Sequence, residues 1–451
     1  MSSPPDRARG RERRRDAPRR RLATLAPRPA GADVVDALLI DTRGYDATLL
    51  PTRWSRMATD PLSFLRGAAS LMSADLAATP ASGITVQLSG DAHVMNFGIF
   101  ASPEGRPVFD LNDFDETEEG PFEWDVKRLA TSAVVLAATR GMSVERARSL
   151  ADAAVDEYRE SIERFSRMRW LEVWYSALDV ADAVADLRGF FAADDRRVVE
   201  GMLGRVRVDP DRRRFERLME PDRFAIRHDP PHLVPLAELA EPLATRDLVY
   251  QVLDGYPSTL VSDRRFLLSR FRAVDVARQV VGVGSVGLAV YAVLMRGRDD
   301  DDPFFLQVKE ARTPTRSTSS EMALEPAERV VRGQRLLQAT PDPFLGWHTV
   351  RTRSGPRSFY VRQLYDGKAS VALDQLDHAR VTDYVRLCAW ALARAHARSG
   401  RAGEIAGYVG RGDAFREAVG RFAMDYAART HEDHAALRHA LDEGRVAAAP
   451  R

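Results

Sequence analysis

One stretch of the chain, residues 88–116, constrains its fold and chemistry more than any other. It reads LSGDAHVMNFGIFASPEGRPVFDLNDFDE and concentrates acidic, amide and imidazole side chains. Asp91 is followed five positions later by Asn96, and an Asn-Asp-Phe-Asp run occupies residues 112–115. A carboxylate can accept the proton of an attacking hydroxyl, and an amide oxygen beside a second carboxylate is a ligand set that suits Mg²⁺. This spacing therefore predicts a site for phosphate chemistry.

Composition narrows the class of protein. At 451 residues the chain exceeds what one hydrophobic core usually serves, so we expect two or three packing units. Its net charge of +1 gives no bulk attraction to nucleic acid or membranes. Cys388 is the only cysteine, which excludes an internal disulfide and a cysteine-based zinc cluster. No stretch approaches the ~20 apolar residues of a membrane-spanning helix, and the N-terminus lacks the apolar core of a secretory signal, so we expect a cytoplasmic protein.

Changes in composition divide the chain into four parts. Residues 1–30 are rich in Arg, Pro and Ala and are predicted to be a disordered basic tail. This tail alone favours a nucleic-acid partner, which we do not expect. Residues 31–270 are predicted to be mostly helical and to carry the acidic segment, whereas residues 271–366 are rich in strand patterns. Residues 367–451 are helical again and are expected to pack on the first helical part, so the expected fold class is α+β.

Local patterns place individual elements. Asp60 before Pro61 is a typical helix start, with Asp as the N-cap and Pro at the first helical position. A second helix is expected to begin near Trp124 and Asp125. The predicted strands are residues 84–88, 108–111, 280–281, 289–294, 304–308, 348–351 and 359–364, and a helix is predicted over residues 320–339.

A glycine-rich turn lies in the strand-rich part of the chain. Residues 282–287 read Gly-Val-Gly-Ser-Val-Gly between two predicted strands. A dinucleotide-binding turn of this pattern requires a helix after the glycines, so the strand that follows favours a loop that covers phosphates instead. The candidate nucleotide-binding residues of this loop are Gly282, Gly284, Ser285 and Gly287.

A lysine and a helix follow the glycine-rich turn. Lys309 ends the strand predicted at residues 304–308. A glycine-rich loop, a strand-end lysine and a following helix are the order in which protein kinases bring a lysine to the nucleotide phosphates, paired with a glutamate of that helix. Glu328 is the expected partner of Lys309, because Glu325 precedes Pro326 and lies near the helix start.

Several motifs resemble those of one bacterial family. They are Arg56-Met57, Gly90-Asp91-Ala92-His93 and residues 64–67, 96–98, 112–116, 124–129, 282–287, 308–311, 329–331, 333–335 and 392–397. On these motifs the chain is similar to the family catalogued as domain of unknown function 2252, over residues 40–435. The family name carries no activity, so the chemistry has to come from the residues.

The segment around Asp91 also resembles the aminoglycoside phosphotransferase branch of the kinase-like superfamily. The pattern there is His-Gly-Asp-x-His-x-x-Asn followed by an Asp-Phe-Asp-type metal site, and here Ser89 replaces the first histidine. The resemblance implies that Asp91 is the catalytic base. His93 belongs to the same candidate site, as a ligand, an acceptor contact or a donor that stabilises the loop. Three further roles are implied: Asn96 and Asp113 as Mg²⁺ ligands, Asp115 as a second carboxylate at the metal, and Asp125 as a structural aspartate that holds the loop.

The order of the motifs differs from that of kinases. There the glycine-rich loop and the lysine precede the catalytic loop, whereas here they follow it by nearly two hundred residues. A circular permutation accounts for this order and is physically permissible where termini lie close together on the surface. The resemblance thus implies a circularly permuted, kinase-like bilobal fold with a five-stranded nucleotide lobe. The strand at residues 359–364 would be its hinge, where Gln363 and Leu364 bond adenine through the backbone.

An ATP- and Mg²⁺-dependent phosphotransferase that acts on an unknown, small-molecule acceptor is the function these patterns favour. Two alternatives stay open. One is a catalytically silent, nucleotide-binding module on the same scaffold. The other is a metal-dependent phosphoester hydrolase, although such enzymes generally need more histidines than the close pairs His228/His232 and His431/His434. Its candidate metal ligands are Asp91, His93, Asp113 and Asp115.

Overall fold

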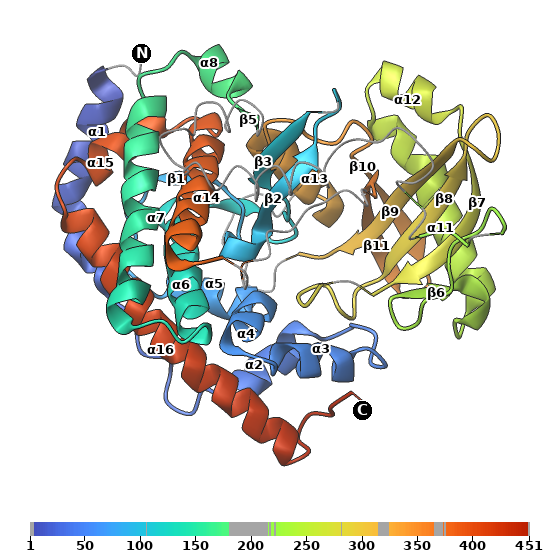
Figure 1. Cartoon of the computed structure of the whole chain (residues 1–451), viewed down its shortest axis with the longest axis horizontal. Helices are drawn as coiled ribbons and strands as arrows, with labels where there is room; N and C mark the ends of the chain where they lie inside the picture. The colour runs from blue at the N-terminus through green and yellow to red at the C-terminus, as the bar shows by residue number, and fades with distance from the viewer. Residues whose placement is uncertain are drawn as a thin grey trace.

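The computed structural model describes residues 4–104, 106–179, 215, 218–220, 222–280, 282–313, 324–364, 373 and 376–449. These residues form an α+β protein with antiparallel sheets, which confirms the predicted class. Figure 1 shows the largest sheet at one end of the molecule, the long helices at the other end, and two small sheets between them.

The largest sheet has six strands in the order β10-β11-β9-β8-β7-β6, and all neighbours are antiparallel. Val293, Leu306 and Val308 pack on one face with helix α11. Because successive side chains of a strand point to opposite faces, Lys309 lies on the other face. The bounds are β6 Leu233–Pro235, β7 Arg272–Gln279, β8 Val290–Arg296, β9 Pro303–Ala311, β10 Gly346–Thr352, β11 Gly355–Gln363 and α11 Pro242–Gly255.

The prediction of five strands in this sheet was wrong by one strand. β6 was missed because three residues after Pro230-Pro231 are too short to show a periodic pattern. The strand predicted at residues 280–281 was misplaced: β7 covers residues 272–279, Val280 follows it, and Val281 is outside the described residues. The helix predicted over residues 320–339 is described from Pro326 to Leu337, as α13, and the earlier residues to 323 are outside the described ranges.

The acidic segment spans the gap between two paired strands. β1 (Thr85–Leu88) pairs antiparallel with β4 (Glu118–Pro121), so that Leu88 lies opposite Glu118 and both ends of the segment are fixed at one place. Within the segment, β2 (Phe97–Ala101) and β3 (Pro107–Leu111) form a hairpin, of which only the second strand was predicted, and the short β5 (Leu178–Asp179) adds a third strand.

Helices from both ends of the sequence form the main core. α14 packs along α7, and α16 crosses α6 and α7, as Figure 1 shows. α6 is buried along nearly its whole length, because it is enclosed by α7, α14 and α16. No helix among the described ranges is long and apolar enough to cross a membrane. The bounds are α6 Glu123–Thr139, α7 Val144–Phe165, α8 Trp170–Tyr175, α12 Ser262–Leu268, α14 His378–Arg398, α15 Ala402–Val409 and α16 Ala414–Asp442.

The N-terminal segment is ordered, so the prediction of a disordered tail was wrong for residues 4–30. α1 (Pro4–Asp16) packs against α15, where the Arg14 Nε donates to the Tyr408 carbonyl (2.8 Å) and Arg19 donates to the Val409 carbonyl (2.6 Å). The last carbonyls of a helix lack intrahelical partners, and arginines of the segment fill that role. Further on, the chain forms η1 Arg19–Ala23, α2 Val34–Asp41, α3 Leu50–Met57, α4 Pro61–Gly67 and α5 Ala69–Ala77.

A buried lysine near the start of α6 is expected to lower the stability of the folded chain. Lys127 is fully buried, its Nζ has no hydrogen-bond partner in the described part of the chain, and it lies 4.2 Å from the centre of the Phe422 ring. Burial lowers the pKa of Lys127 to about 8, although Glu123 one turn earlier opposes the shift. The unfolded chain therefore binds this proton more tightly than the folded chain, so the buried charge opposes folding at neutral pH.

We expect Lys127→Met to raise the free energy of unfolding at pH 7 by about 2–3 kcal/mol. Because the folded pKa is lowered, the cost of the charge is complete below pH 8 and disappears as the pH rises toward 10.5. The increase in the free energy of unfolding that Lys127→Met produces should therefore be smaller at high pH. Urea unfolding of both proteins at pH 7 and pH 10 measures this increase. An increase of the same size at both pH values would contradict the prediction.

Candidate functional site

The loop that carries Asp91 requires glycine at the position before it. Gly90 before it has a positive φ of 82°, and an added Cβ would collide with the Glu116 carbonyl. The Arg128 guanidinium of α6 holds the Asp91 carboxylate through Nε (2.8 Å), and the Asn96 side-chain nitrogen donates to its other oxygen (3.2 Å). Burial raises the pKa of Asp91 above its usual range, although Arg128 opposes this shift. The side chain is thus fixed in place and disposed to accept a proton.

His93 stabilises the same loop. Its Nδ1 accepts from the Met95 backbone N–H (3.1 Å), so the proton of a neutral ring is on Nε2, which faces Asp91 across 3.5 Å. Burial, together with the charges of Arg128 and Arg66, holds the pKa of His93 well below its usual range. His93 is therefore neutral at physiological pH, and it accepts from the backbone where a donor had been expected.

The two carboxylates of the acidic run have different surroundings. Asp115 forms an ion pair with Lys309 and accepts from the Tyr360 hydroxyl (2.8 Å). Burial raises the pKa of Asp115, but these two partners outweigh burial and hold it below its usual range. Asp113 accepts only the long bond from the Asp115 backbone N–H (3.3 Å), and burial and the charge of Asp115 raise its pKa. Asp113 is the carboxylate of the pair that still lacks a cation.

Asp125 holds the loop that carries Asp91. Its carboxylate accepts from the backbone N–H groups of Ser89 (2.7 Å) and Gly90 (3.1 Å) and lies 3.1 Å from the His396 Nε2. Because an ionised carboxylate can only accept, the His396 Nε2 donates and its Nδ1 accepts from the Tyr158 hydroxyl (2.8 Å). A buried chain of hydrogen bonds thus runs from α7 and α14 to the loop that carries Asp91.

The glycine-rich loop is bound to the N-terminal helices. Arg53 of α3 donates to the carbonyls of Val283 (3.1 Å) and Gly284, and to the Gly67 carbonyl (2.9 Å). Figure 1 shows the loop between β7 and β8 reaching toward these helices. Gly287, with φ of 101°, lies under Tyr45, where an added Cβ would stand 2.6 Å from the ring. The loop therefore has a fixed position relative to the Asp91 segment.

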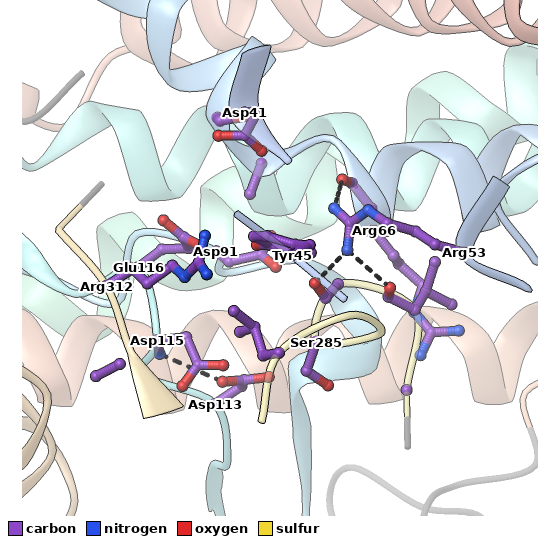
Figure 2. A pocket seen from close by; sticks show the side chains of 18 of the residues that line it. Asp41, Tyr45, Arg53, Arg66, Asp91, Asp113, Asp115, Glu116, Ser285 and Arg312 are labelled. Atoms are coloured by element: carbon purple, nitrogen blue, oxygen red, sulfur yellow. Dashed lines mark hydrogen bonds between the residues drawn. The ribbon is translucent and has the colours of Figure 1, made fainter. Parts of the chain in front are cut away.

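One cavity of about 270 Å³ unites most of the predicted site residues. Figure 2 shows labelled side chains of its lining, among them Asp91, Asp113 and Asp115 from the acidic segment and Ser285 from the glycine-rich loop. Lys309 reaches this lining through its ion pair with Asp115. The predicted residues in the lining are Asp91, His93, Asn96, Asp113, Asp115, Gly282, Gly284 and Ser285, whereas Gly287 lies behind it.

Besides Gly287 and Lys309, three predicted residues are absent from the lining of the cavity: Glu328, Gln363 and Leu364. Glu328 forms an ion pair with Arg332 one turn later, so its predicted pairing with Lys309 was wrong. The contact from α13 to the acidic loop is made by the next residue, Arg329, which donates to the carbonyls of Asp115 (2.8 Å) and Thr117. The backbone N–H groups of the two expected hinge residues are already bonded, Gln363 to the Asp342 carboxylate and Leu364 to the Phe305 carbonyl.

The contact of Arg128 with Asp91 could have been predicted from the sequence, whereas the contact of Tyr360 with Asp115 could not. Arg128 follows Asp125 by three residues on a predicted helix, which places both on the face toward the Asp91 loop, so helical spacing was an available signal. Tyr360 shares Asp115 with Lys309 because Tyr360 and Lys309 lie opposite each other in the pairing of β11 with β9. Strand register of this kind is not legible from the sequence.

The donor set fits a hard divalent cation at Asn96 and Asp113. Asn96 uses its side-chain nitrogen on the backbone carbonyl and carboxylate of Asp91, which directs its amide oxygen away from Asp91. Asp113 is a buried carboxylate without a bonded cation, and oxygen ligands of these two kinds suit Mg²⁺. Within the described ranges, no group of three or more His, Cys, Asp or Glu side chains is arranged to hold a metal ion. Asp115 is engaged by Lys309 and Tyr360.

Comparison with known proteins gives a family. The family model described as "Uncharacterized protein conserved in bacteria (DUF2252)" matches residues 43–440. No curated protein and no solved structure matches the chain.

Proposed function

The chain belongs to the bacterial DUF2252 family, and we propose that it is an ATP- and Mg²⁺-dependent phosphotransferase with a circularly permuted, kinase-like arrangement of its site. One observation carries the proposal. The glycine-rich loop at Gly282–Ser285 and the segment with Asp91 and Asp113 lie far apart in the sequence but line one cavity, and Lys309 reaches Asp115 across it. Phosphotransfer requires these groups together, since its catalysis is mostly positioning and charge neutralisation.

Asp91 is assigned to the acceptor in this proposal. Its carboxylate orients the attacking hydroxyl and takes up the proton as the new bond to phosphorus forms. Arg128 and Asn96 keep the carboxylate in one orientation, and Asp125 keeps the backbone of the loop in place. Preorganised groups of this kind need no rearrangement at the moment of reaction.

Lys309 and the acidic run are assigned to the nucleotide. Lys309 is buried and is held in the charged state by Asp115, whose charge and that of Tyr360 raise its pKa. From this position it can bind nucleotide phosphates as a point charge. Asn96 and Asp113 would hold Mg²⁺, which supplies neutralisation of the phosphate charge when bound. Asp115 orients Lys309 and is therefore less available than Asp113 as a ligand.

The hydrolase alternative has less support from the geometry. The histidine pairs that a two-metal hydrolase would need as further ligands have other neighbours: His228 faces Glu238 (3.3 Å), His232 faces Asp229 (3.7 Å), and the His434 Nε2 lies 2.9 Å from the Ala58 carbonyl. None of them lines the cavity of Asp91. The glycine-rich loop in the cavity wall has a use in nucleotide binding that a two-metal hydrolase does not require.

Calorimetric titration of the purified chain with ATP, with and without millimolar Mg²⁺, tests the proposal. We expect saturable, Mg²⁺-dependent binding that Lys309→Ala and Asp113→Asn each weaken by about tenfold or more. Arg298→Gln, at an exposed arginine of the β8–β9 turn, is the matched control and should bind ATP like the parent protein. Binding that depends on Asp113 alone would make the glycine-rich loop a bystander, and no binding at all would overturn the proposal.

A further inference from the structure

The arginines that line the cavity, and Arg128 beside Asp91, differ in how their guanidinium groups are used. Arg53 is bonded to the carbonyls of the glycine-rich loop, and Arg312 donates to the carbonyls of Arg43 (2.8 Å) and Gly44. Arg128 is bonded to Asp91 and to the Leu65 carbonyl (2.7 Å). Two arginines of the lining, Arg43 and Arg66, have no such partner among the described residues, and Arg66 is the less exposed of the two. It lies in the last turn of α4 and lines the cavity, but it has no hydrogen bond or ion pair with the described residues.

The unused guanidinium is partly enclosed. The Arg66 Nε is buried and has no acceptor in the described part of the protein, and the residue also lines the cavity. A buried donor of a charged group without a partner costs free energy. A planar guanidinium presents a rigid fork of N–H donors that matches the two oxygens of a carboxylate or a phosphate. Arg66 is thus suited to an anionic ligand that enters the cavity.

Arg66 belongs to the Asp91 side of the cavity. The positive charge of Arg66 lowers the pKa of both Asp91 and His93, in each case beside the larger effect of burial. The carboxylates Asp113 and Asp115 are influenced by other cations, chiefly Lys309. Different cations thus act on the two parts of the site: Lys309 on the acidic run, and Arg66 on Asp91 and His93. The acidic run is where the nucleotide phosphates are proposed to bind, and Asp91 is the proposed base.

Negative charges restrict where an anion could bind. Asp41 and Glu116 also line the cavity, and burial raises the pKa of Glu116 to about 8, so this side chain is mostly uncharged at pH 7. The Asp41 carboxylate repels an anionic group, which is attracted only near an unpaired cation. Arg43, which is exposed and lines the same cavity, adds positive charge at the rim. The cations of the lining that an anion could pair with are thus Arg66 and, at the rim, Arg43, and of these two Arg66 is the one whose charge acts on Asp91.

We infer that Arg66 binds a carboxylate or phosphate group of the acceptor substrate, which is accordingly a small anionic molecule with a hydroxyl group. This inference rests on the proposed phosphotransferase function, because only that function gives the Asp91 side of the cavity to the acceptor. Binding of the anion by Arg66 would place the hydroxyl of the same molecule beside Asp91 and would set the specificity of the enzyme.

Inorganic phosphate and succinate are the probes that test the inference. Each is titrated calorimetrically into the full chain, first alone and then with Mg²⁺ and saturating ADP. We expect at least one of them to bind with millimolar affinity, and Arg66→Gln to weaken that binding by about tenfold or more. Arg66→Lys should weaken it less, because it keeps the charge and loses the fork. The probe that binds more tightly identifies the group, and Arg298→Gln should change nothing.

The outcomes separate this inference from the function on which it rests. Thermal unfolding first checks that the parent protein and Arg66→Gln are both folded. Equal binding of the probes to these two proteins would overturn the inference. It would also be overturned if neither protein bound either probe. A loss of ATP affinity in Arg66→Gln with unchanged ADP affinity would also overturn it, since Arg66 would then contact the terminal phosphate. Arg66-dependent binding of the probes by a chain that binds no nucleotide would retain the anion site and reject the phosphotransferase.

Discussion

Asp91→Asn should abolish turnover of Mg²⁺-ATP while nucleotide binding stays largely intact. The amide has the shape of the carboxylate and can still accept from Arg128, but it cannot take up a proton. Loss of a general base typically costs about 10²–10⁴ in rate. Slow release of ADP from ATP with water as the acceptor measures this without knowledge of the natural acceptor, and ATP titration of the same protein measures the binding.

The matched control for Asp91 is a carboxylate outside the site. Asp152 lies on α7 in a partly exposed ion pair with Arg148 (3.0 Å), so Asp152→Asn removes the same charge far from the cavity. It should leave turnover unchanged. Turnover retained in Asp91→Asn would remove Asp91 from the role of base, and lost nucleotide binding would indicate that Asp91 belongs to the nucleotide site instead.

Asp125→Ala should lower the free energy of unfolding by about 3 kcal/mol or more. The substitution leaves two buried backbone donors, at Ser89 and Gly90, and the His396 ring without their shared acceptor. Each unpaired buried donor costs about 1–3 kcal/mol, and removing one partner of a buried charged network is strongly destabilising. The loop that carries Asp91 should lose its fixed position as well, so turnover should fall with stability.

Urea unfolding compares Asp125→Ala with a surface control. Asp152→Ala should change stability by no more than about 0.5 kcal/mol, because exposed ion pairs contribute little. Asp125→Asn retains one acceptor oxygen and should lie between the two, which keeps the test informative if the alanine variant does not fold. A change at Asp125 as small as that at Asp152 would show that the loop is held by other contacts.

The sequence was most informative where chemistry and spacing are local. Asp91 and Asn96 lie on one short loop, and their hydrogen bonds arise within five residues of backbone. The helix start at Asp60 is confirmed, since its carboxylate accepts from the Ser63 backbone N–H (2.8 Å). Caps, turns and strand-end loops follow from neighbouring residues, so the pattern alone is sufficient to predict them.

Prediction was wrong where the partner of a charge comes from elsewhere. Glu328 was expected to pair with Lys309, but Asp115 takes that place because β9 lies over the acidic loop and Glu328 pairs along its own helix. The arginine-rich N-terminus was expected to be disordered, but Arg14 and Arg19 find carbonyl acceptors at the end of α15. The composition of a segment gives the number of its charged side chains. It does not show which hydrogen-bond acceptors the fold brings close to those side chains.

The sequence by itself determined the kinds of side chain available and the loops that present them: a base candidate at Asp91, oxygen ligands at Asn96 and Asp113, and a glycine-rich turn after β7. Only the tertiary structure decided that these groups line one cavity, and that Arg66 faces it unpaired. The physical reason is range. Backbone geometry fixes a loop over a few residues, whereas the meeting of segments nearly two hundred residues apart depends on the packing of whole helices and sheets.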